Sequence, residues 1–238
     1  MLALIDGDVQ IFWAAAGSED EADCIDKLHK IMQESIESCF TDEYKLAIKG
    51  KGNFRKDLYP FYKAKRTAPE EDIKARLKVA HSTLLKEYNA VMAHGMEADD
   101  QVRIWAEEAR TAGQPFVVVA EDKDLKCIVG KHYNPKKSLH FTMNEDEADL
   151  FFHAQLLAGD PTDDIPGLWR VGLKTAMNKL LLDIPMGERM DKVVEVYKEK
   201  CGDEWYEKLL ETGSLIHILR TPDDFFKIEE KYCLKPVH

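Results

Sequence analysis

The chain has 238 residues, a formal net charge of −11 and a hydrophobic content of 45%. This length fits one large domain or a domain with an appendage, and the apolar content suffices for a core. The apolar runs are too short to span a bilayer, and the first residues lack the basic stretch of a signal peptide. Five cysteines without C-x-x-C spacing argue against a disulfide framework or a zinc site. We therefore expect a globular protein of a reducing, cytoplasmic compartment without membrane contact. A monomer is a separate expectation, which these numbers do not determine.

The first two thirds of the chain alternate short apolar runs with amphipathic segments. Residues 2–5 predict a buried strand that ends at Asp6, and apolar residues at helical spacing predict a helix over 24–39. Further strands are expected at 44–48, 89–93, 116–119 and 139–142, and further helices at 69–88, 98–111 and 145–158. This alternation is typical of an α/β fold, with a mostly parallel sheet flanked by helices on both faces.

The last third of the chain predicts helices without a convincing strand. These helices are expected at about 172–182, 189–200 and 204–219. We therefore expect an α/β core over residues 1–150 and a helical region over 151–238 that packs on it.

A basic segment stands out against the acidic chain. It has one acid, Asp57, and its basic residues are Lys45, Lys49, Lys51, Arg55, Lys56, Lys63, Lys65 and Arg66. The aromatic residues Phe54, Tyr59, Phe61 and Tyr62 are interleaved with them. Basic side chains contact phosphates and aromatic faces stack on bases, so the segment favours single-stranded or flapped nucleic acid. A solvated surface loop is the alternative that composition leaves open.

Ten acidic residues fall into four short clusters. The clusters are Asp6 with Asp8, then Glu97 with Asp99 and Asp100, then Asp122 with Asp124, and finally Asp160 with Asp163 and Asp164. The first three follow a strand end or begin a helix reached from a strand, so parallel topology brings them to one edge of the sheet. The fourth lies at the junction with the helical region and could fold over that edge.

Gathered carboxylates repel one another, and a half-buried set stays charged if a cation neutralises it. Oxygen ligands without a nearby His or Cys select Mg²⁺ or Mn²⁺. Two such ions roughly 3.5–4 Å apart favour in-line displacement at phosphorus. Each cluster alone has a structural alternative as a helix cap or a turn, and the convergence of all four supports the metal site.

Five sequence blocks resemble, in the same order, those of the 5′-nuclease or flap endonuclease family. The likeness is greatest to its short phage-type 5′→3′ exonucleases and to the 5′-nuclease domain of bacterial DNA polymerase I. The blocks are LIDGD, FRKDLYPFYKAKR at 54–66, GMEADD, EDKDL and LAGDPTDDIPGLWRVGLKTA. The resemblance covers about residues 2–182 and implies a PIN-like 5′-nuclease core and a basic arch or clamp at about 50–90. It also implies a helix–turn–helix-type duplex-binding element over 160–182.

The resemblance also implies roles for individual residues. The positions that match metal ligands are Asp6, Glu97, Asp99, Asp100, Asp122, Asp124, Asp160 and Asp163. Lys63 and Arg66 match basic residues that contact the scissile phosphate, and on a helix their spacing puts them on one face. The residues expected to contact DNA are Lys49, Lys51, Arg55, Lys56, Tyr62, Lys65, Gly167, Arg170, Gly172 and Lys174. Two Mg²⁺ or Mn²⁺ ions, and K⁺ near 167–172, are the implied cofactors.

Three positions depart from the family pattern. The second strand ends in Lys49 where the family has an Asp, so one auxiliary carboxylate is missing. Lys65 replaces an Asn before the arch Arg. Arg170 replaces a glycine of the duplex-gripping loop, which affects close backbone approach to phosphate or the monovalent cation.

The resemblance predicts a 5′→3′ exonuclease or flap endonuclease of a phage or bacterial cell interior. Its expected partners are DNA with 5′ single-stranded ends or flaps, and RNA–DNA hybrids as a further class. The missing second-strand carboxylate and Arg170 motivate an alternative, a branched-DNA binding protein with weak or lost catalysis. A PIN-type ribonuclease is a third reading, but it explains neither the YKAKR segment nor the GDPTDDIPG block.

Overall fold

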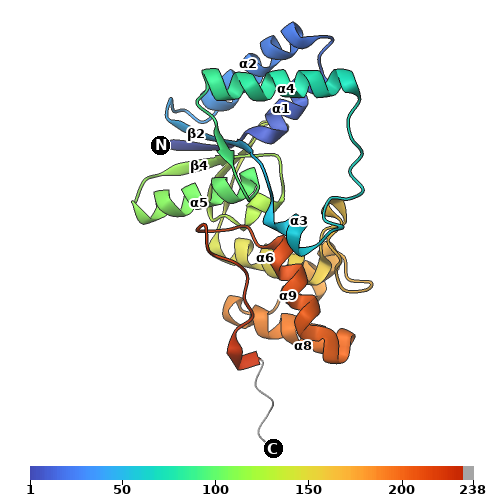
Figure 1. Ribbon diagram of the computed structural model, residues 1–238. Helices are drawn as coiled ribbons and strands as arrows, with labels where there is room; N and C mark the ends of the chain where they lie inside the picture. Colours follow the sequence, from blue (N-terminus) through green and yellow to red (C-terminus); the bar gives the residue numbers. More distant parts are fainter. Residues whose placement is uncertain (233–238) are drawn as a thin grey trace, which may run out of the picture. The chain divides into compact units, whose positions relative to one another are not determined.

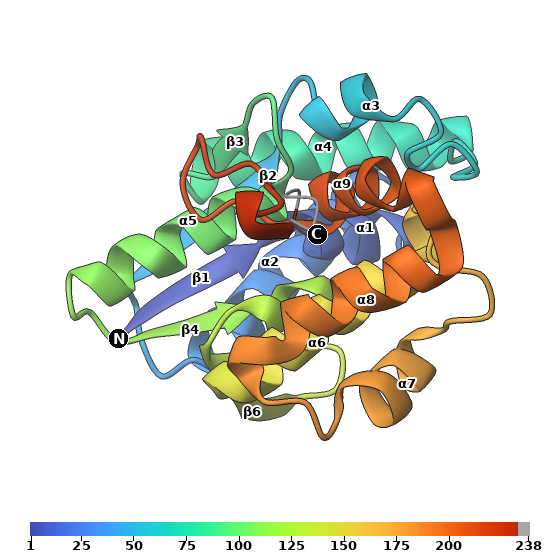
Figure 2. The ribbon, with the colours of Figure 1, turned by 90° about the horizontal axis from the view of Figure 1, so that it is seen from below.

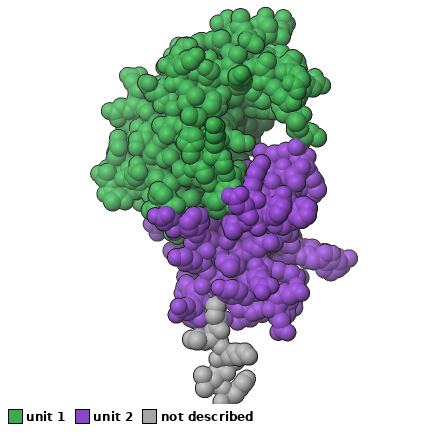
Figure 3. All heavy atoms as spheres, viewed as in Figure 1, with its two compact units in different colours: residues 1–54, 67–144, 218–222 green, residues 55–66, 145–217, 223–238 purple. Residues whose placement is uncertain are grey.

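The computed structural model describes residues 1–232, and the chain divides into two compact units, coloured separately in Figure 3. Unit 1 contains Met1–Phe54, Thr67–Asn144 and Ile218–Pro222. Unit 2 contains Arg55–Arg66, Glu145–His217 and the chain from Asp223 onwards. The division differs from a boundary at residue 150, because residues 55–66 and 218–222 each belong to the unit that is distant from them in sequence.

Unit 1 contains a six-stranded sheet with strand order β3-β2-β1-β4-β5-β6. The strands are β1 (Leu2–Asp6), β2 (Tyr44–Lys49), β3 (Val91–Ala93), β4 (Phe116–Val119), β5 (Gly130–Asn134) and β6 (Leu139–Met143). All neighbouring pairs are parallel except β5 and β6, and Figure 2 shows β1 and β4 running side by side. The mostly parallel α/β sheet predicted from the sequence is confirmed.

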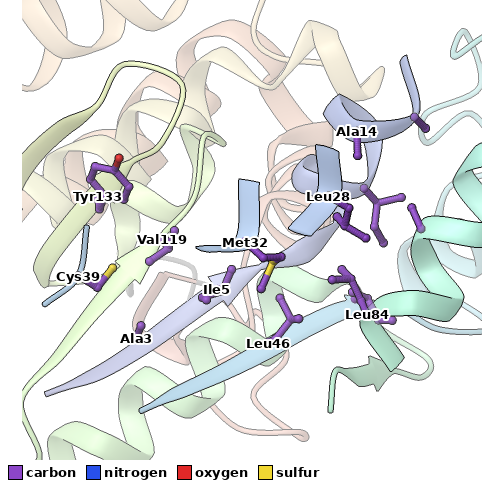
Figure 4. Close-up of a cluster of buried hydrophobic side chains, with 14 of the residues drawn as sticks. Ala3, Ile5, Ala14, Leu28, Met32, Cys39, Leu46, Leu84, Val119 and Tyr133 are labelled. Atoms are coloured by element: carbon purple, nitrogen blue, oxygen red, sulfur yellow. The ribbon is translucent and has the colours of Figure 1, made fainter. Parts of the chain in front are cut away.

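Helices cover both faces of this sheet (Figure 1). The helices of unit 1 are α1 (Gly7–Ala16), α2 (Glu21–Glu37), α4 (Glu71–Glu87) and α5 (Ala98–Thr111). Side chains alternate along a strand, so Ala3 and Ile5 of β1 pack in the core under α1, α2 and α4, as Figure 4 shows. Leu2 and Leu4 instead join the core under α5. The sheet is therefore buried on both faces, as its continuous apolar strands predict.

Helix α1 begins directly after β1, and the sequence analysis did not predict it. Asp6 caps the helix, because its carboxylate accepts the Asp8 N–H at 3.1 Å. Gly7 is required by close packing, since a Cβ here would lie 2.8 Å from Cγ2 of Ile48 and 2.9 Å from the carbonyl oxygen of Ala47. The start of α1 therefore rests directly against β2.

Unit 2 is helical over the segments that follow β6. Its helices are α6 (Glu145–Ala158), α7 (Leu173–Thr175), the π-helix η3 (Ala176–Leu181), α8 (Arg189–Cys201) and α9 (Trp205–Ile216). The predicted helix at 172–182 corresponds to α7 and η3. Apolar residues of these helices form one core, which includes Leu156, Tyr197 and Leu209. Figure 1 shows α6, α8 and α9 grouped together.

Two sequence-distant segments complete the units. Arg55 of the short helix α3 (Phe54–Leu58) is 2% exposed, and its guanidinium donates to the carbonyl oxygens of Leu215 and His217 at 2.9 and 2.6 Å. All three residues belong to unit 2. In unit 1, Ile218 is buried in the core under α5, and the Leu219 N–H donates to Asp100 at 2.9 Å. Each unit therefore depends on a segment from the other end of the chain.

Four cysteines within the described residues, Cys24, Cys39, Cys127 and Cys201, are free thiols, and Cys233 lies outside those residues. Over residues 1–232, no helix combines the length and apolar character needed to cross a membrane.

Candidate active site

The carboxyl ends of β1 and β4 bring the first and third acid clusters to one edge of the sheet in unit 1. Ile5 pairs with Val119, so Asp6 lies one residue beyond the end of β4. Asp122 follows Val119 after three residues. The convergence predicted from parallel topology is therefore built into the strand register.

Asp6 is a strongly perturbed carboxyl at this edge. It is 4% exposed, and burial, followed by the charges of Asp8, Asp122 and Glu97, raises its pKa to about 8. These causes involve three of the sequence clusters, all within unit 1. A buried carboxyl surrounded by carboxylates binds a proton or a cation more readily than one in water.

The side chain of Asp8, in α1, contacts the end of β2. This is the strand that ends in Lys49 where the family pattern has an Asp. Its Oδ1 accepts the backbone N–H of Lys49 at 2.9 Å. Burial raises the pKa of Asp8, the Lys49 hydrogen bond and the Lys49 charge lower it, and Glu97 raises it. The sequence analysis placed Asp8 in the first acid cluster but not among the residues that match the family's metal ligands.

His81 of α4 was also missed by sequence reasoning. Its charge lowers the pKa of Asp8, and its Nε2 donates to the carbonyl oxygen of Lys49 at 3.1 Å. The expectation that no His lies near the acids is therefore wrong for Asp8. The His81 imidazole already donates a hydrogen bond to a backbone carbonyl oxygen. The carboxylate oxygens are therefore the side-chain atoms of this edge that are best suited to bind a metal ion.

The second cluster forms the first turn of α5, where helix N–H groups stabilise negative charge. Glu97 and Asp100 form a capping box, and the Glu97 N–H donates to Oδ2 of Asp100 at 2.9 Å. Oδ1 of Asp100 accepts the Leu219 N–H, and Asp100 is fully buried. Asp100 therefore organises the start of α5, while Glu97 and Asp99 are partly exposed.

The third cluster follows β4 in a tight loop. The Asp124 N–H donates to Oδ1 of Asp122 at 2.8 Å, and Lys123 Nζ lies 2.9 Å from Oδ1 of Asp124. Both aspartates are partly exposed, so their carboxylates remain accessible to a ligand.

The fourth cluster belongs to unit 2. Asp160 caps the 3-10 helix η2 (Pro161–Asp163), accepting the Thr162 N–H at 2.9 Å. Asp160 and Ile165 exchange backbone hydrogen bonds of 3.1 and 2.9 Å, which closes the loop around Asp163. Asp160 and Asp163 are both buried.

Lys63 and Arg66 share one acidic partner in unit 2. Lys63 Nζ lies 3.4 Å from Oδ2 of Asp163, and Arg66 donates to Oδ1 of the same carboxylate. The two residues do not share a helix face, because α3 ends at Leu58 and Lys63 has a left-handed φ of 55°. Asp163 thus gathers both predicted catalytic cations.

The neighbouring pair in unit 2 is Lys65 and Asp164. The Lys65 N–H donates to Oδ2 of Asp164 at 2.9 Å, and Lys65 Nζ lies 2.8 Å from Oδ1. The hydrogen bond from the Lys65 side chain is the main reason that the pKa of Asp164 falls below its usual value. Lys65 is itself 88% exposed, so its position remains open to a second anion.

The predicted DNA-contacting residues divide by exposure. Those with exposed side chains are Lys49, Lys51, Lys56, Lys65, Arg170 and Lys174, and Gly172 is exposed as well. Arg55 and Tyr62 are buried, at 2% and 3% exposure, so burial argues against direct contact with nucleic acid. Gly167 has a packing role, because a Cβ there would lie 1.9 Å from the carbonyl oxygen of Ala158.

The acids of unit 1 fit a hard divalent cation. The side-chain donors around Asp6 are carboxylate oxygens, which Mg²⁺ and Mn²⁺ prefer. The raised pKa of Asp6 reports an electrostatic cost that a cation offsets when it binds.

Solved structures with a similar fold are nucleases of bacteriophage T5. One is the T5 flap endonuclease in a pseudo-enzyme-product complex with DNA and metal ions, with a TM-score of 0.62 and 16% identity over 90% of this chain and 98% of that one. Another is the T5 5′-exonuclease with divalent zinc ions, with a TM-score of 0.63 and 18% identity over 90% of this chain and 86% of that one. At these identities the likeness concerns the fold.

Curated relatives share more sequence over a shorter stretch. DNA polymerase I of Rhizobium leguminosarum is 29% identical over 141 residues, which cover 53% of this chain and 14% of that protein. A 5′-3′ exonuclease of Mycobacterium tuberculosis is 31% identical over 160 residues, which cover 53% of this chain and 50% of that protein. The chain therefore matches half or less of the length of these relatives.

Residues 2–153 match the family model described as 5′-3′ exonuclease, N-terminal resolvase-like domain. The match includes β1, the basic segment and the first three acid clusters, and it covers more than half of the chain. The chain belongs to the 5′-3′ exonuclease N-terminal resolvase-like domain family.

Proposed function

We propose that this chain is a divalent-metal-dependent nuclease that hydrolyses phosphodiester bonds at 5′ ends or flaps of DNA. The observation that carries this proposal is the gathering of Asp6, Glu97 and Asp122 at the carboxyl edge of the sheet, with the pKa of Asp6 raised to about 8. Buried carboxylate oxygens that are crowded in this way bind a hard divalent cation. Membership of a 5′-3′ exonuclease family supports the reaction class.

The metal-binding role is assigned to acids from both units. Those of unit 1 are Asp6, Glu97, Asp99, Asp100, Asp122 and Asp124, and those of unit 2 are Asp160 and Asp163. Two Mg²⁺ or Mn²⁺ ions, when bound, supply an activated water and stabilise charge on the phosphate oxygens. Asp100 contributes by fixing the backbone of Glu97, since both of its oxygens accept backbone N–H groups.

Lys63 and Arg66 are assigned to the scissile phosphate. Both are paired with Asp163 in unit 2, so binding of a phosphate exchanges one anionic partner for another. Arg66 can form two parallel hydrogen bonds with a phosphate, whereas Lys63 acts as a point charge. The pairing with Asp163 holds both cations close to a carboxylate proposed to bind metal.

The exposed basic residues are assigned to the DNA backbone. They are Lys49, Lys51, Lys56, Lys65, Arg170 and Lys174. In this proposal, residues 160–182 act as the helix–turn–helix-type element that grips the duplex, with K⁺ near 167–172. RNA–DNA hybrids form a second substrate class, and the protein acts as a monomer inside the cell.

The test uses 5′-labelled flap and blunt duplex substrates with Mg²⁺, Mn²⁺ or EDTA. Short labelled products that form with either metal and disappear with EDTA support the proposal. The proposal fails if the wild-type protein leaves both substrates intact with both metals. It also fails if the Asp122→Ala/Asp124→Ala double variant retains full activity.

A second candidate is a branched-DNA binding protein with little catalysis. It is favoured by one observation, namely that β2 ends in Lys49 rather than in a carboxylate. Turnover separates the two functions. Many product molecules per protein molecule rule out the second candidate, whereas tight binding with less than one turnover supports it.

A further inference from the structure

Strand β6 forms an outer edge of the sheet in unit 1. The strand order ends at β6, labelled in Figure 2, which pairs antiparallel with β5. The Ala120 N–H donates to the carbonyl oxygen of Tyr133 at 3.1 Å, so the backbone groups of Tyr133 face β4. In an antiparallel pair the opposite residue, His140, then turns its N–H and C=O away from β5, as does Thr142. Over residues 1–232, no backbone hydrogen bond to another element occupies these outward groups.

The outward edge of β6 lacks the residues that usually protect an edge strand from pairing. Natural edges are blocked by Lys or Pro within the strand, or by a bulge that interrupts its register. The sequence of β6, LHFTM, contains neither residue, and its pairing with β5 is continuous from Leu139 to Met143. The side chains of His140 and Thr142 are exposed. The edge therefore keeps the hydrogen-bonding groups that an added strand requires.

A pocket of about 310 Å³ adjoins this edge, and its lining includes Phe40, Val117, His140 and Thr142, all in unit 1. Phe40 is 86% exposed, and its ring stacks on His140 with centroids 6.3 Å apart. Its φ of 53° is a left-handed conformation that favours glycine, yet an apolar ring is held there in solvent. Every second side chain of an added strand lies on the face of His140 and Thr142. One apolar side chain of that strand therefore meets Phe40 and the pocket.

The charge of the β5–β6 hairpin favours an acidic partner. Residues 125–144 contain no acid, although the whole chain has a net charge of −11. Their exposed lysines are Lys126, Lys131, Lys136 and Lys137, of which Lys136 pairs with Glu121. A positive hairpin attracts a segment with acidic side chains and repels the same edge of a second copy of this chain.

We propose that the β6 edge binds an extended acidic peptide segment of another protein as an added strand. Its binding elements are the outward backbone groups of His140 and Thr142, the pocket beside Phe40, and the lysines of the hairpin. The edge presents both N–H donors and C=O acceptors, which a peptide backbone complements, whereas a phosphodiester backbone offers acceptors alone. Two strands, β4 and β5, separate β6 from β1 and Asp6. The inference is therefore independent of the proposed function.

The probe is a fluorescein-labelled peptide of about eight residues that alternates Glu and Val, which matches the two faces of a strand. Fluorescence anisotropy at low salt should show saturable binding to the full chain. Two matched peptides separate the contributions. Replacing every Glu by Lys should weaken binding at least about tenfold through charge. Methylating every backbone nitrogen keeps the charge, removes the donors, and should also weaken binding about tenfold or more.

Variants of the protein locate the contact. Thr142→Pro removes one outward N–H and should weaken binding of the Glu–Val peptide about tenfold, whereas Thr142→Ala keeps that N–H and should bind within about twofold of wild type. Because the lost N–H has no role in the sheet, circular dichroism should show that Thr142→Pro is folded. Lys131→Glu should weaken binding, and Lys200→Glu, which changes an exposed lysine of α8, is its control.

A direct readout is the amide spectrum of ¹⁵N-labelled protein, in which the peptide should shift the signals of His140 and Thr142. The inference is overturned if the Glu–Val peptide does not bind, if the methylated peptide binds equally well, or if the shifts lie outside residues 131–143. It also fails if duplex DNA displaces the peptide, or if the wild type forms a dimer that Thr142→Pro dissociates. Should Thr142→Pro not fold, the peptide comparison on the wild type still decides.

Discussion

Unit 1 and unit 2 both gather acidic side chains, but they stabilise them in different ways. In unit 1 the carboxylates of Asp8, Asp122 and Glu97 add to burial and raise the pKa of Asp6 to about 8. In unit 2 two neighbouring carboxylates have basic partners, with Lys63 and Arg66 on Asp163 and Lys65 on Asp164, whereas in unit 1 only Asp124 has a close one, Lys123, among the ion pairs described. The pKa of Asp164 accordingly falls below its usual value.

This difference separates two uses of negative charge. A carboxyl that is crowded by other carboxyls has a strong affinity for an added cation, because that cation removes both repulsion and desolvation cost. A carboxylate that already pairs with basic side chains is stabilised less by an added metal ion. It does, however, position those basic side chains where they can bind a phosphate. Asp6 of unit 1 is therefore the acid expected to gain most from metal, while Asp163 of unit 2, also assigned to metal, additionally holds Lys63 and Arg66 for a phosphate.

The largest expected effect comes from removing Asp6, the buried carboxyl of unit 1 whose pKa is raised to about 8. Asp6→Asn should lower the cleavage rate about 1,000-fold, since a metal site supplies several kcal/mol of transition-state stabilisation. Single-turnover kinetics with Mg²⁺ measure this. The control is Asp26→Asn, which neutralises an exposed acid of α2. Equal rates for Asp6→Asn and wild type would contradict a metal site in unit 1.

A smaller loss of cleavage rate is expected when Lys63, the basic residue of unit 2 assigned to the phosphate, is removed. Lys63→Ala should slow cleavage about 100-fold, as expected for loss of one electrostatic contact in the transition state. Its Kd for a flap substrate should change less than about threefold, because that contact strengthens in the transition state. Kinetics and binding are compared on the same substrate. Equal losses in rate and affinity would instead assign Lys63 to ground-state binding.

Stability without metal should depend on pH through Asp6. The pKa of Asp6 is about 8 in the folded state and 3.8 in its ordinary state, so folding favours its protonated form. The stability from this protonation is complete below pH 3.8 and is lost as the pH rises towards 8. We expect the Tm in EDTA to fall by about 5 °C or more between pH 5 and pH 8.

Asp6→Asn tests this assignment, because it removes the titrating group while keeping its shape. The variant should show a flatter Tm profile in EDTA, and Mg²⁺ or Mn²⁺ should raise the wild-type Tm at pH 8. An increase of the wild-type Tm from pH 5 to pH 8 would contradict the account of Asp6.

The smallest effect is expected for the exposed pair of unit 2. Lys65→Ala should change the Tm by less than about 2 °C, because solvent screens an ion pair whose lysine is 88% exposed. Thermal unfolding at pH 7 measures this, and Lys200→Ala is a control for loss of an exposed lysine. A large loss of stability would show that Lys65 is a structural residue.

The regular elements with clear periodicity were predictable from the sequence. Segments 98–111, 116–119 and 145–158 match α5, β4 and α6 at both ends, because strong apolar patterns and acidic helix starts define them. Helix α1 was missed since most of its residues after Asp8 are apolar and show no polar face. Strand β5 was missed because Gly130, Lys131 and His132 do not read as a strand.

The candidate site was predictable to the extent that strand topology determines it. The edge location of Asp6 and Asp122 follows from parallel strands alone. The partners of Asp163 could not be predicted from spacing, because Arg66 is 97 residues away in sequence. The burial of Arg55 and Tyr62 could not be predicted from the sequence either. Both side chains have an apolar part and a polar end, so they occur both in cores and on surfaces.

The segment containing Leu219 has a consequence for how the protein is made. The Leu219 N–H reaches the buried Asp100 across 119 residues of sequence, and Ile218 fills the same side of unit 1. A nascent chain that stops before residue 218 leaves one oxygen of Asp100 without this donor. The complete packing of unit 1 therefore requires a segment that is synthesised after most of unit 2. A fragment ending near residue 144 should therefore be less stable than unit 1 within the full chain.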